Sequence, residues 1–189
     1  MHRLKVIRHG RPASTWGDVD ADPGLDAVGH EQAAAVAAAF MALPEADRPT
    51  RVVSSPLRRC RETAAPLAQA LGVEMLVDIQ VGEIPTPAGL SPTDRPAWLR
   101  KAFEGTWEQI EGDLDYGAWA QSVATALAGY AGAAVFSHFV ALNAAISVAT
   151  DEGRVAAFRP DHCSVTTFEV CDGRLILVEK GREAQSQVL

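Results

Sequence analysis

Four short runs of apolar, largely β-branched residues recur along the chain, and each is typical of a buried β-strand. They are residues 3–8 (RLKVIR), 51–55 (RVVSS), 74–77 (EMLV) and 133–137 (AAVFS). Segments rich in helix-forming residues separate these runs. Strands that alternate with helices favour an α/β fold whose mostly parallel sheet is covered on both faces.

Two helices can be placed between the first three runs. Residues 26–43 are dense in Ala, which predicts the first helix. The second is predicted from Ser55 and Pro56, as N-cap and first helical position, to Leu71, with Gly72 ending it. Ser caps the unpaired N–H groups of a first turn, and Pro lacks an N–H that this turn does not need.

The C-terminal part of the chain predicts a β-hairpin instead of another helix. The runs SVTTFEV and RLILVEK flank Cys171, Asp172 and Gly173, and an Asp-Gly pair favours a tight turn between antiparallel strands. At 189 residues the chain is the size of one substantial domain. We therefore expect one domain over residues 1–189, a three-layer α/β/α sandwich with a mostly parallel central sheet and at least one antiparallel strand.

The middle third of the chain has a different composition. Residues 84–96 contain four prolines, which predicts a long loop, and Trp98, Phe103, Trp107 and Trp119 follow at spacings compatible with helices. One interpretation is that residues 84–119 form a small cap over one end of the sheet. The alternative is that these aromatic side chains complete the core.

Residues 116–150 contain no Asp, Glu, Lys or Arg, a length that could span a bilayer. Gly129 and Gly132 interrupt this stretch, and polar residues are scattered through it. The better interpretation is therefore a helix, a turn, a buried strand and a second helix.

The N-terminal MHRLKVIRHG predicts no secretory signal, and three cysteines without a CxxC pair fit a reducing compartment. We expect a cytoplasmic protein with no membrane partner.

Charge narrows the classes of ligand. A net charge of −7 disfavours nucleic acid as a partner, although a local basic pocket can still attract a small anion. Such a pocket is predicted where polar residues follow strands: Arg8 and His9 end the first run, Arg58, Arg59 and Arg61 follow the second, and His138 ends the fourth. In an open α/β sheet, ligands bind beyond the carboxyl ends of the strands.

Guanidinium and imidazole groups together suit a phosphate dianion. A neutral imidazole can attack phosphorus, and a carboxylic acid can protonate the leaving alkoxide. His162, Cys163 and Cys171 lack the spaced second pair of a tetrahedral metal site, so no metal is predicted there. The sequence thus predicts a phosphate site without metal or cofactor.

Four motifs resemble those of the histidine phosphatase superfamily, also called the phosphoglycerate mutase-like family. They are Arg8-His9-Gly10, SSPLRRCRETA at residues 54–64, VGEIP at residues 81–85 and SHF at residues 137–139. The resemblance runs nearly from end to end. Together the spaced motifs form a far more specific signal than Arg-His-Gly alone.

The resemblance implies a role for each motif residue. His9 would be the phosphorylated nucleophile, Arg8, Arg59 and His138 would hold the phosphoryl oxygens, and Glu83 would be the proton donor. The backbone N–H of Phe139 would also face the phosphate, although many relatives have Gly there. The motif spacing selects Arg59 over Arg58, and it selects Glu83 over Glu74 and Glu104.

One departure bears on the reaction. Residues 11–14 (RPAS) replace the acidic or amide, hydroxyl and Asn residues with which many relatives continue, and this argues against sugar-phosphate mutase activity. Arg11 and Ser14 become candidates for substrate binding.

The leading hypothesis is a metal-independent phosphomonoesterase that acts on a small phosphorylated metabolite through phosphohistidine. The alternatives are a protein phosphohistidine phosphatase and, in another class, a non-catalytic phosphate-binding regulatory module. The oligomeric state stays open, a dimer included.

Overall fold

The computed structural model describes residues 3–14, 20 and 22–184. Within this part of the chain one six-stranded sheet has the order β3-β2-β4-β1-β5-β6. The strands are β1 (Arg3–Arg8), β2 (Arg51–Ser54), β3 (Met75–Val77), β4 (Ala133–Ser137), β5 (Val165–Cys171) and β6 (Arg174–Glu179). The helices are α1 (Ala27–Met41), α2 (Arg58–Leu71), α3 (Arg95–Glu104), α4 (Tyr116–Ala128) and α5 (Phe139–Thr150), with short 3-10 turns η1 (Glu45–Asp47), η2 (Ile79–Val81) and η3 (Trp107–Gln109).

The sheet is mixed, as predicted. Strands β1 and β4, β4 and β2, and β2 and β3 pair in parallel. Strand β5 is antiparallel to β1 and to β6. The β5–β6 turn has positive φ at Asp172 (50°) and Gly173 (73°), the backbone that a two-residue hairpin turn prefers.

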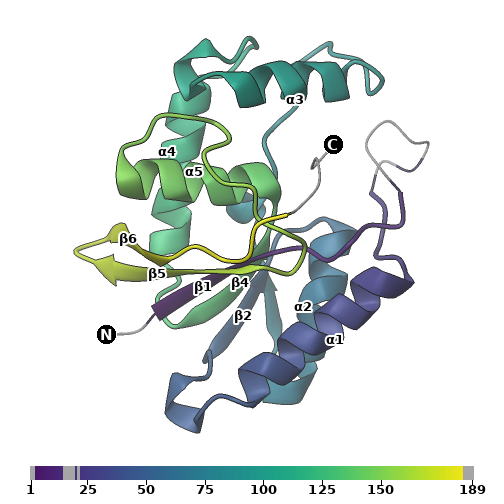
Figure 1. The fold of residues 1–189 in the computed structure, drawn as a ribbon, viewed down its shortest axis with the longest axis vertical. Helices are drawn as coiled ribbons and strands as arrows, with labels where there is room; N and C mark the ends of the chain where they lie inside the picture. Colours follow the sequence, from purple (N-terminus) through teal and green to yellow (C-terminus); the bar gives the residue numbers. More distant parts are fainter. Residues whose placement is uncertain (1–2, 15–19, 21, 185–189) are drawn as a thin grey trace.

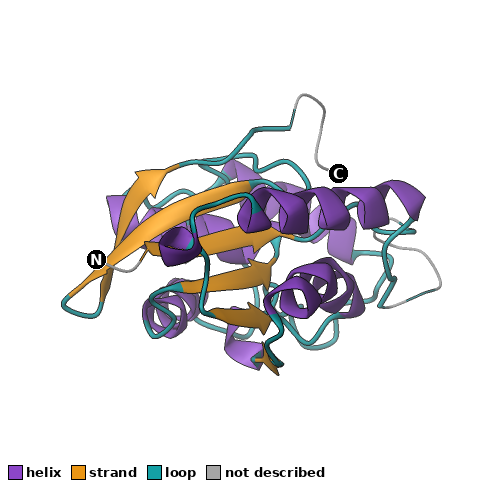
Figure 2. Cartoon of the chain, turned by 90° about the horizontal axis from the view of Figure 1, so that it is seen from below, coloured by secondary structure: helices purple, strands orange, loops and turns teal. Residues whose placement is uncertain are grey.

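Helices cover both faces of the sheet, as Figures 1 and 2 show. Side chains of β4 alternate between two buried clusters, because successive strand residues point to opposite faces. Ala134 and Phe136 pack with residues of α1 and α2, whereas Ala133 and Val135 pack with residues of α4 and α5. The predicted three-layer α/β/α arrangement is therefore confirmed.

The middle segment contains a loop up to Asp94, then α3, η3 and the start of α4. Helix α3 begins at Arg95, so the predicted loop over 84–96 is two residues too long. Pro96 is accommodated in the first helical turn, where its missing N–H has no intrahelical acceptor. Trp107 is buried, and Trp98 and Trp119 pack against the same cluster, so aromatic side chains of this segment complete the core. The proposed role of residues 84–119 as a cap stays a prediction.

Helix α2 starts later than the sequence predicts. Its N-cap is Leu57, which makes no side-chain cap, and its first residue is Arg58. Ser55 is not the cap, because its hydroxyl lies 2.8 Å from Nε2 of His138. The predicted C-terminal stop is correct, since Gly72 adopts the left-handed conformation with φ 66°.

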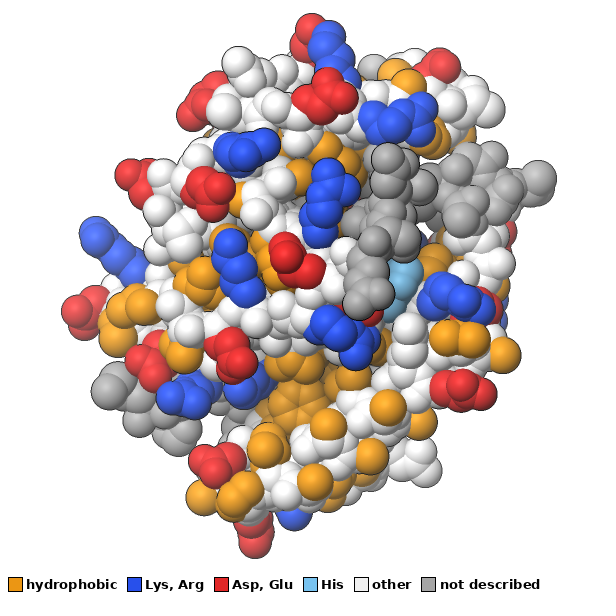
Figure 3. All heavy atoms as spheres, in the orientation of Figure 1, with side chains coloured by type: hydrophobic (Ala, Val, Ile, Leu, Met, Phe, Trp, Pro, Cys, Tyr) orange, Lys and Arg blue, Asp and Glu red, His pale blue; other side chains and the backbone are white. Residues whose placement is uncertain are grey.

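The uncharged stretch over residues 116–150 forms α4, β4 and α5. In the described ranges, no helix combines the length and apolar character needed to cross a membrane. On the face drawn in Figure 3, acidic and basic side chains are interspersed.

Candidate active site

The carboxyl ends of β1 and β4 bring two imidazoles together. Arg8 is the last residue of β1 and pairs in register with Ser137, the last residue of β4. His9 and His138 follow directly, and their ring centroids lie 5.3 Å apart. Parallel neighbouring strands end at the same edge of a sheet. His9 and His138, which are 129 positions apart in the sequence (138 − 9), therefore meet because β1 and β4 are neighbours in the sheet.

The His9 imidazole is held in one tautomer. Its Nδ1 lies 2.8 Å from the carbonyl oxygen of Gly10. A carbonyl only accepts, so Nδ1 carries the proton and Nε2 keeps a lone pair. Burial lowers the pKa of His9 well below 6.5, and the charges of Arg59 and Arg8 lower it further. The ring is therefore a neutral base at physiological pH.

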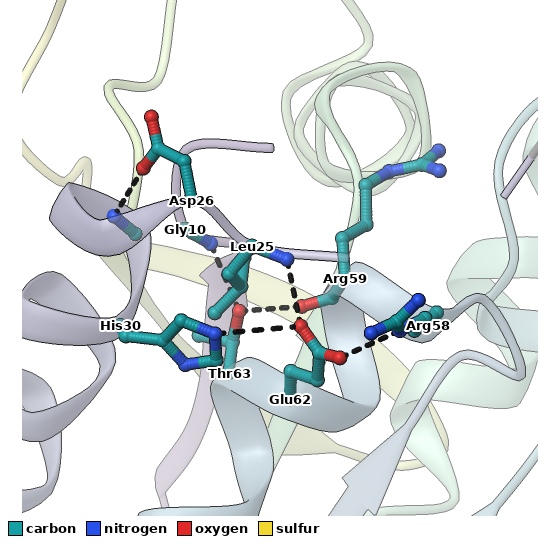
Figure 4. Close-up of polar contacts among 9 residues, drawn as sticks. Gly10, Leu25, Asp26, His30, Arg58, Arg59, Glu62 and Thr63 are labelled. Carbon is teal, nitrogen blue, oxygen red and sulfur yellow. Dashed lines mark hydrogen bonds and ion pairs between the residues drawn. The ribbon is translucent and has the colours of Figure 1, made fainter. Parts of the chain in front are cut away.

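Gly10 lies where two elements approach closely. A Cβ at this position would sit 2.8 Å from the carbonyl oxygen of Gly29 in α1, so only glycine fits. The N–H of Gly10 donates to the hydroxyl of Thr63 (2.9 Å), and this hydroxyl donates to the carbonyl of Arg59 (2.6 Å), as Figure 4 shows. Thr63 thus connects the backbone beside His9 to helix α2.

Two arginines are buried beside the imidazoles. Arg8 is 6% exposed and Arg59 is 7% exposed. Arg8 donates from Nη1 to the carbonyl of Pro160 (2.8 Å), and its guanidinium lies 5.4 Å from the centre of the Phe139 ring. Burial lowers the pKa of Arg8 to about 10, which still leaves it charged at neutral pH.

Both arginines carry buried donors that point to an anionic ligand. The Nε atoms of Arg8 and Arg59 are buried and have no hydrogen-bond partner among the described residues. Buried polar groups are nearly always paired, and a buried guanidinium pairs best with an anion. This cluster is therefore suited to bind a small dianion.

Arg58 and Arg59 point in different directions, as Figure 4 shows. The Arg58 side chain is 57% exposed and its Nε lies 2.7 Å from Oε1 of Glu62. Glu62 also accepts from the N–H of Leu25 (2.7 Å) and so anchors the loop before α1. Arg59 instead places Nη2 at 3.2 Å from Nδ1 of His138.

His138 is the N-cap residue of α5 and is fully buried. Because Arg59 donates to its Nδ1, the ring proton lies on Nε2, which donates to the Ser55 hydroxyl at 2.8 Å. The thiol of Cys60 packs 3.3 Å from the same Nε2. Burial lowers the pKa of His138 well below 6.5, and Arg59 adds to this effect.

Glu83 lies at the same edge, in the loop after η2. Its Oε1 accepts from the N–H of Ile84 (3.0 Å) and from the N–H of Val140 in the first turn of α5 (3.2 Å). Burial raises the pKa of Glu83, although the Ile84 N–H and nearby arginines oppose that rise. Glu74 and Glu104 are both exposed, and of the three glutamates Glu83 is the one that shares the field of Arg8 and Arg59.

Phe139, Arg11 and Ser14 are the three remaining predicted residues. Phe139 is the first residue of α5, next to His138, and contacts Arg8 through its ring. Arg11 is half exposed and forms an ion pair with Asp26, the N-cap of α1. The hydroxyl of Ser14 is buried and has no hydrogen-bond partner in the described part of the chain.

Sequence reasoning missed two side chains near the site. The His162 ring centroid lies 5.8 Å from that of His9, and burial lowers the pKa of His162 to about 4. Arg95 donates to the carbonyl of Ile84, the residue next to Glu83. In the sequence, His162 was considered only as a candidate metal ligand, and no metal site was predicted there. No motif marks Arg95, whose position depends on how α3 packs.

The fold and the site together define a class of three-layer α/β protein with imidazoles and buried arginines at the carboxyl edge of parallel strands. The sequence model of a protein family, the histidine phosphatase superfamily (branch 1), matches residues 4–182 of this chain. The chain belongs to this superfamily, and the resemblance of its motifs is confirmed. No curated protein sequence gives a significant match.

Several solved structures share the fold. A mycobacterial glucosyl-3-phosphoglycerate phosphatase is 21% identical, with a TM-score of 0.73 over 97% of this chain and 100% of that chain. A phosphoserine phosphatase from Entamoeba histolytica, in complex with 3-phosphoglyceric acid, is 21% identical with a TM-score of 0.75 over 98% of each chain. A mutant described as phosphoserine phosphatase from the same organism, in complex with phosphoserine, is 20% identical with a TM-score of 0.74 over 95% of this chain and 96% of that chain.

Proposed function

We propose that this protein is a metal-independent phosphomonoesterase that hydrolyses small phosphorylated metabolites through a phosphohistidine at His9. The observation that carries the proposal is the fixed tautomer of His9, whose Nδ1 bonds to the Gly10 carbonyl at 2.8 Å. Its Nε2 keeps the lone pair, and the charges of Arg59 and Arg8 and the neighbouring His138 act on the same ring. A neutral nucleophile beside preorganised cations is what phosphoryl transfer needs.

In the first step, Nε2 of His9 attacks the phosphorus atom and the ester P–O bond breaks. The leaving alkoxide takes the proton of Glu83, which the raised pKa of this carboxyl favours. The products are a free alcohol, a phosphohistidine and the Glu83 carboxylate. Arg8 and Arg59, with His138 beside them, stabilise the charge on the transferred oxygens.

In the second step, water attacks the phosphorus atom and gives its proton to the Glu83 carboxylate. The P–N bond breaks, inorganic phosphate leaves, and the lone pair returns to Nε2 of His9. Each group regains its starting protonation state, and no metal ion or cofactor takes part.

Hydrolysis is proposed over mutase activity because Arg11 to Ser14 replace the residues that many relatives carry after Arg-His-Gly. A small substrate is proposed because the ligands named for the similar structures, 3-phosphoglyceric acid and phosphoserine, are small alkyl phosphates. We also propose a cytoplasmic location, which the free thiols of Cys60, Cys163 and Cys171 support.

The test is hydrolysis of 4-nitrophenyl phosphate in the presence of EDTA by the wild type and by His9→Asn. We expect metal-independent turnover, inhibition by vanadate and an acid-labile phosphoenzyme in the wild type, with turnover and phosphoenzyme lost in the variant. Phosphate binding without turnover in the wild type would instead identify a non-catalytic phosphate-binding module. Turnover of phosphohistidine peptides but of no small ester would identify a protein phosphohistidine phosphatase.

A further inference from the structure

A second cavity opens between helix α1 and the sheet, away from the catalytic cluster. Its volume is about 480 Å³, within the range of about 300–1,000 Å³ that small-molecule sites have. Figure 3 shows hydrophobic side chains gathered in this hollow and Lys and Arg side chains along its margin. None of the residues proposed above as catalytic lines this cavity.

The wall of the cavity is mainly apolar. Val36 and Phe40 belong to the buried cluster between the sheet and helices α1 and α2, and Val165 packs against that cluster. Ala35 and Ala39 are exposed residues of α1 at the same cavity, and their short side chains leave it open to solvent. Water against such a wall is displaced at a gain by an apolar group.

Lys5 brings a positive charge to this apolar wall. Its Nζ donates to the hydroxyl of Thr167 (3.0 Å), and it forms no ion pair with any other described residue. Burial and then the charge of Arg3 lower the pKa of Lys5. Glu179 and Asp47 oppose this lowering without contacting the ammonium group. A partly buried ammonium with two unused donor hydrogens is stabilised by an anion.

Arg182 is the other charged residue at the cavity. Its Nε donates to Oδ2 of Asp161 (2.9 Å), and its Nη donors have no partner in the described part of the chain. Gln32 is polar but engaged, since its Oε1 accepts from the N–H of Arg11 (2.9 Å). No Asp or Glu of the described residues lines the cavity, so both of its charges are positive.

We infer that this cavity binds a small amphiphilic carboxylate, with its apolar chain against Val36, Phe40 and Val165 and its carboxylate on Lys5 and Arg182. A small inorganic anion would leave the apolar wall in water, and a neutral apolar molecule would leave both cations without an anion. An amphiphilic carboxylate satisfies both halves of the cavity. The inference does not depend on the proposed phosphatase function, because the two sites share no residue.

Isothermal titration calorimetry with octanoate, butanoate and 1-octanol tests the two halves separately. Each CH₂ group that leaves water strengthens binding about 4-fold, so octanoate should bind at least about 100-fold more tightly than butanoate. The alcohol has the chain without the charge. It should bind about 10-fold more weakly than octanoate, the size of a lost charge-assisted hydrogen bond.

Variants locate the binding site. Ala39→Phe fills the cavity and should weaken octanoate binding about 10-fold or more. Ala38→Phe is the matched control, because Ala38 is an exposed alanine of the same helix that does not line the cavity, and it should change nothing. Lys5→Gln should weaken octanoate about 10-fold and leave 1-octanol unchanged. If Ala39→Phe does not fold by circular dichroism, Ala35→Phe fills the same cavity one helical turn earlier.

Four results would overturn the inference. The first is no binding of octanoate to the wild type, and the second is equal affinity for octanoate and butanoate, which would show that only the charge is bound. The third is loss of octanoate binding in Arg59→Ala but not in Ala39→Phe, which would place the ligand at the catalytic cluster. The fourth is a wild-type dimer in sedimentation that dissociates in Ala39→Phe and binds no octanoate, because a second copy of the chain would then cover the cavity.

Discussion

Thr63 offers a sharp test of how helix α2 supports His9, the proposed nucleophile. Its hydroxyl is fully buried, accepts from the N–H of Gly10 (2.9 Å) and donates to the carbonyl of Arg59 (2.6 Å). The carbonyl of Gly10 in turn holds Nδ1 of His9. Thr63→Val keeps the shape of the side chain and removes the hydroxyl alone.

The expected loss of stability in Thr63→Val follows from which groups lose a hydrogen bond. In the variant the buried N–H of Gly10 faces a methyl group, and an unsatisfied buried donor costs about 1–3 kcal/mol. The Arg59 carbonyl lies within α2, where the helix supplies another donor, so its loss adds little. For a chain of this size the melting temperature should fall by about 2–4 °C per kcal/mol, or by about 2–12 °C.

Catalysis should fall as well, because the backbone that aims His9 loses its anchor. We expect kcat to fall about 10- to 100-fold with KM nearly unchanged, since small misplacement of a reacting group is costly. Thermal melts and steady-state kinetics on 4-nitrophenyl phosphate measure both effects.

Two variants serve as controls for Thr63→Val. Thr63→Ser keeps the hydroxyl and should retain most of the activity. Thr125→Val removes an exposed hydroxyl that bonds to the Gln121 carbonyl within α4, and it should change neither quantity. A melting temperature and kcat that match those of Thr125→Val would refute the role given to Thr63.

Three further predictions concern charged and titratable groups of the site. Glu83→Gln should slow hydrolysis of an alkyl phosphate about 10²- to 10⁴-fold and that of 4-nitrophenyl phosphate far less, because nitrophenolate leaves without a proton. Equal losses on both substrates would exclude Glu83 as the acid. Arg59→Ala should weaken vanadate binding and lower kcat/KM, whereas Arg58→Ala should do neither, because only the former guanidinium contacts His138; the reverse order of losses would contradict the assigned register. The folded state holds the pKa values of His9 and His138 well below 6.5, so the unfolded chain binds more protons in acid. The free energy of unfolding should therefore fall as pH drops below about 6.5, and His9→Asn should show a shallower fall in urea titrations between neutral and acid pH.

The sequence by itself determined the elements whose signals are local. The alternation of β-branched runs with Ala-rich segments predicts β1, β2, β4, α1 and the later helices, because side-chain period and helix propensity act within a few residues. The Asp-Gly pair predicts the last hairpin for the same reason. The motif spacing also selects Arg59 over Arg58, since neighbouring residues of a helix point in different directions.

Other features were decided by the tertiary structure, because they depend on partners far away in the chain. Ser55 has the local signature of an N-cap, yet its hydroxyl binds His138, 83 residues away. Gly10 and Thr63 are 53 residues apart, and their hydrogen bond exists because folding brings α2 next to the residue that follows β1 by two positions. His162 reaches His9 through the turn before β5, and Arg95 reaches the Glu83 loop because α3 lies over it. Local propensities contain no information on these contacts, since strand order and helix packing create them only when the chain is folded.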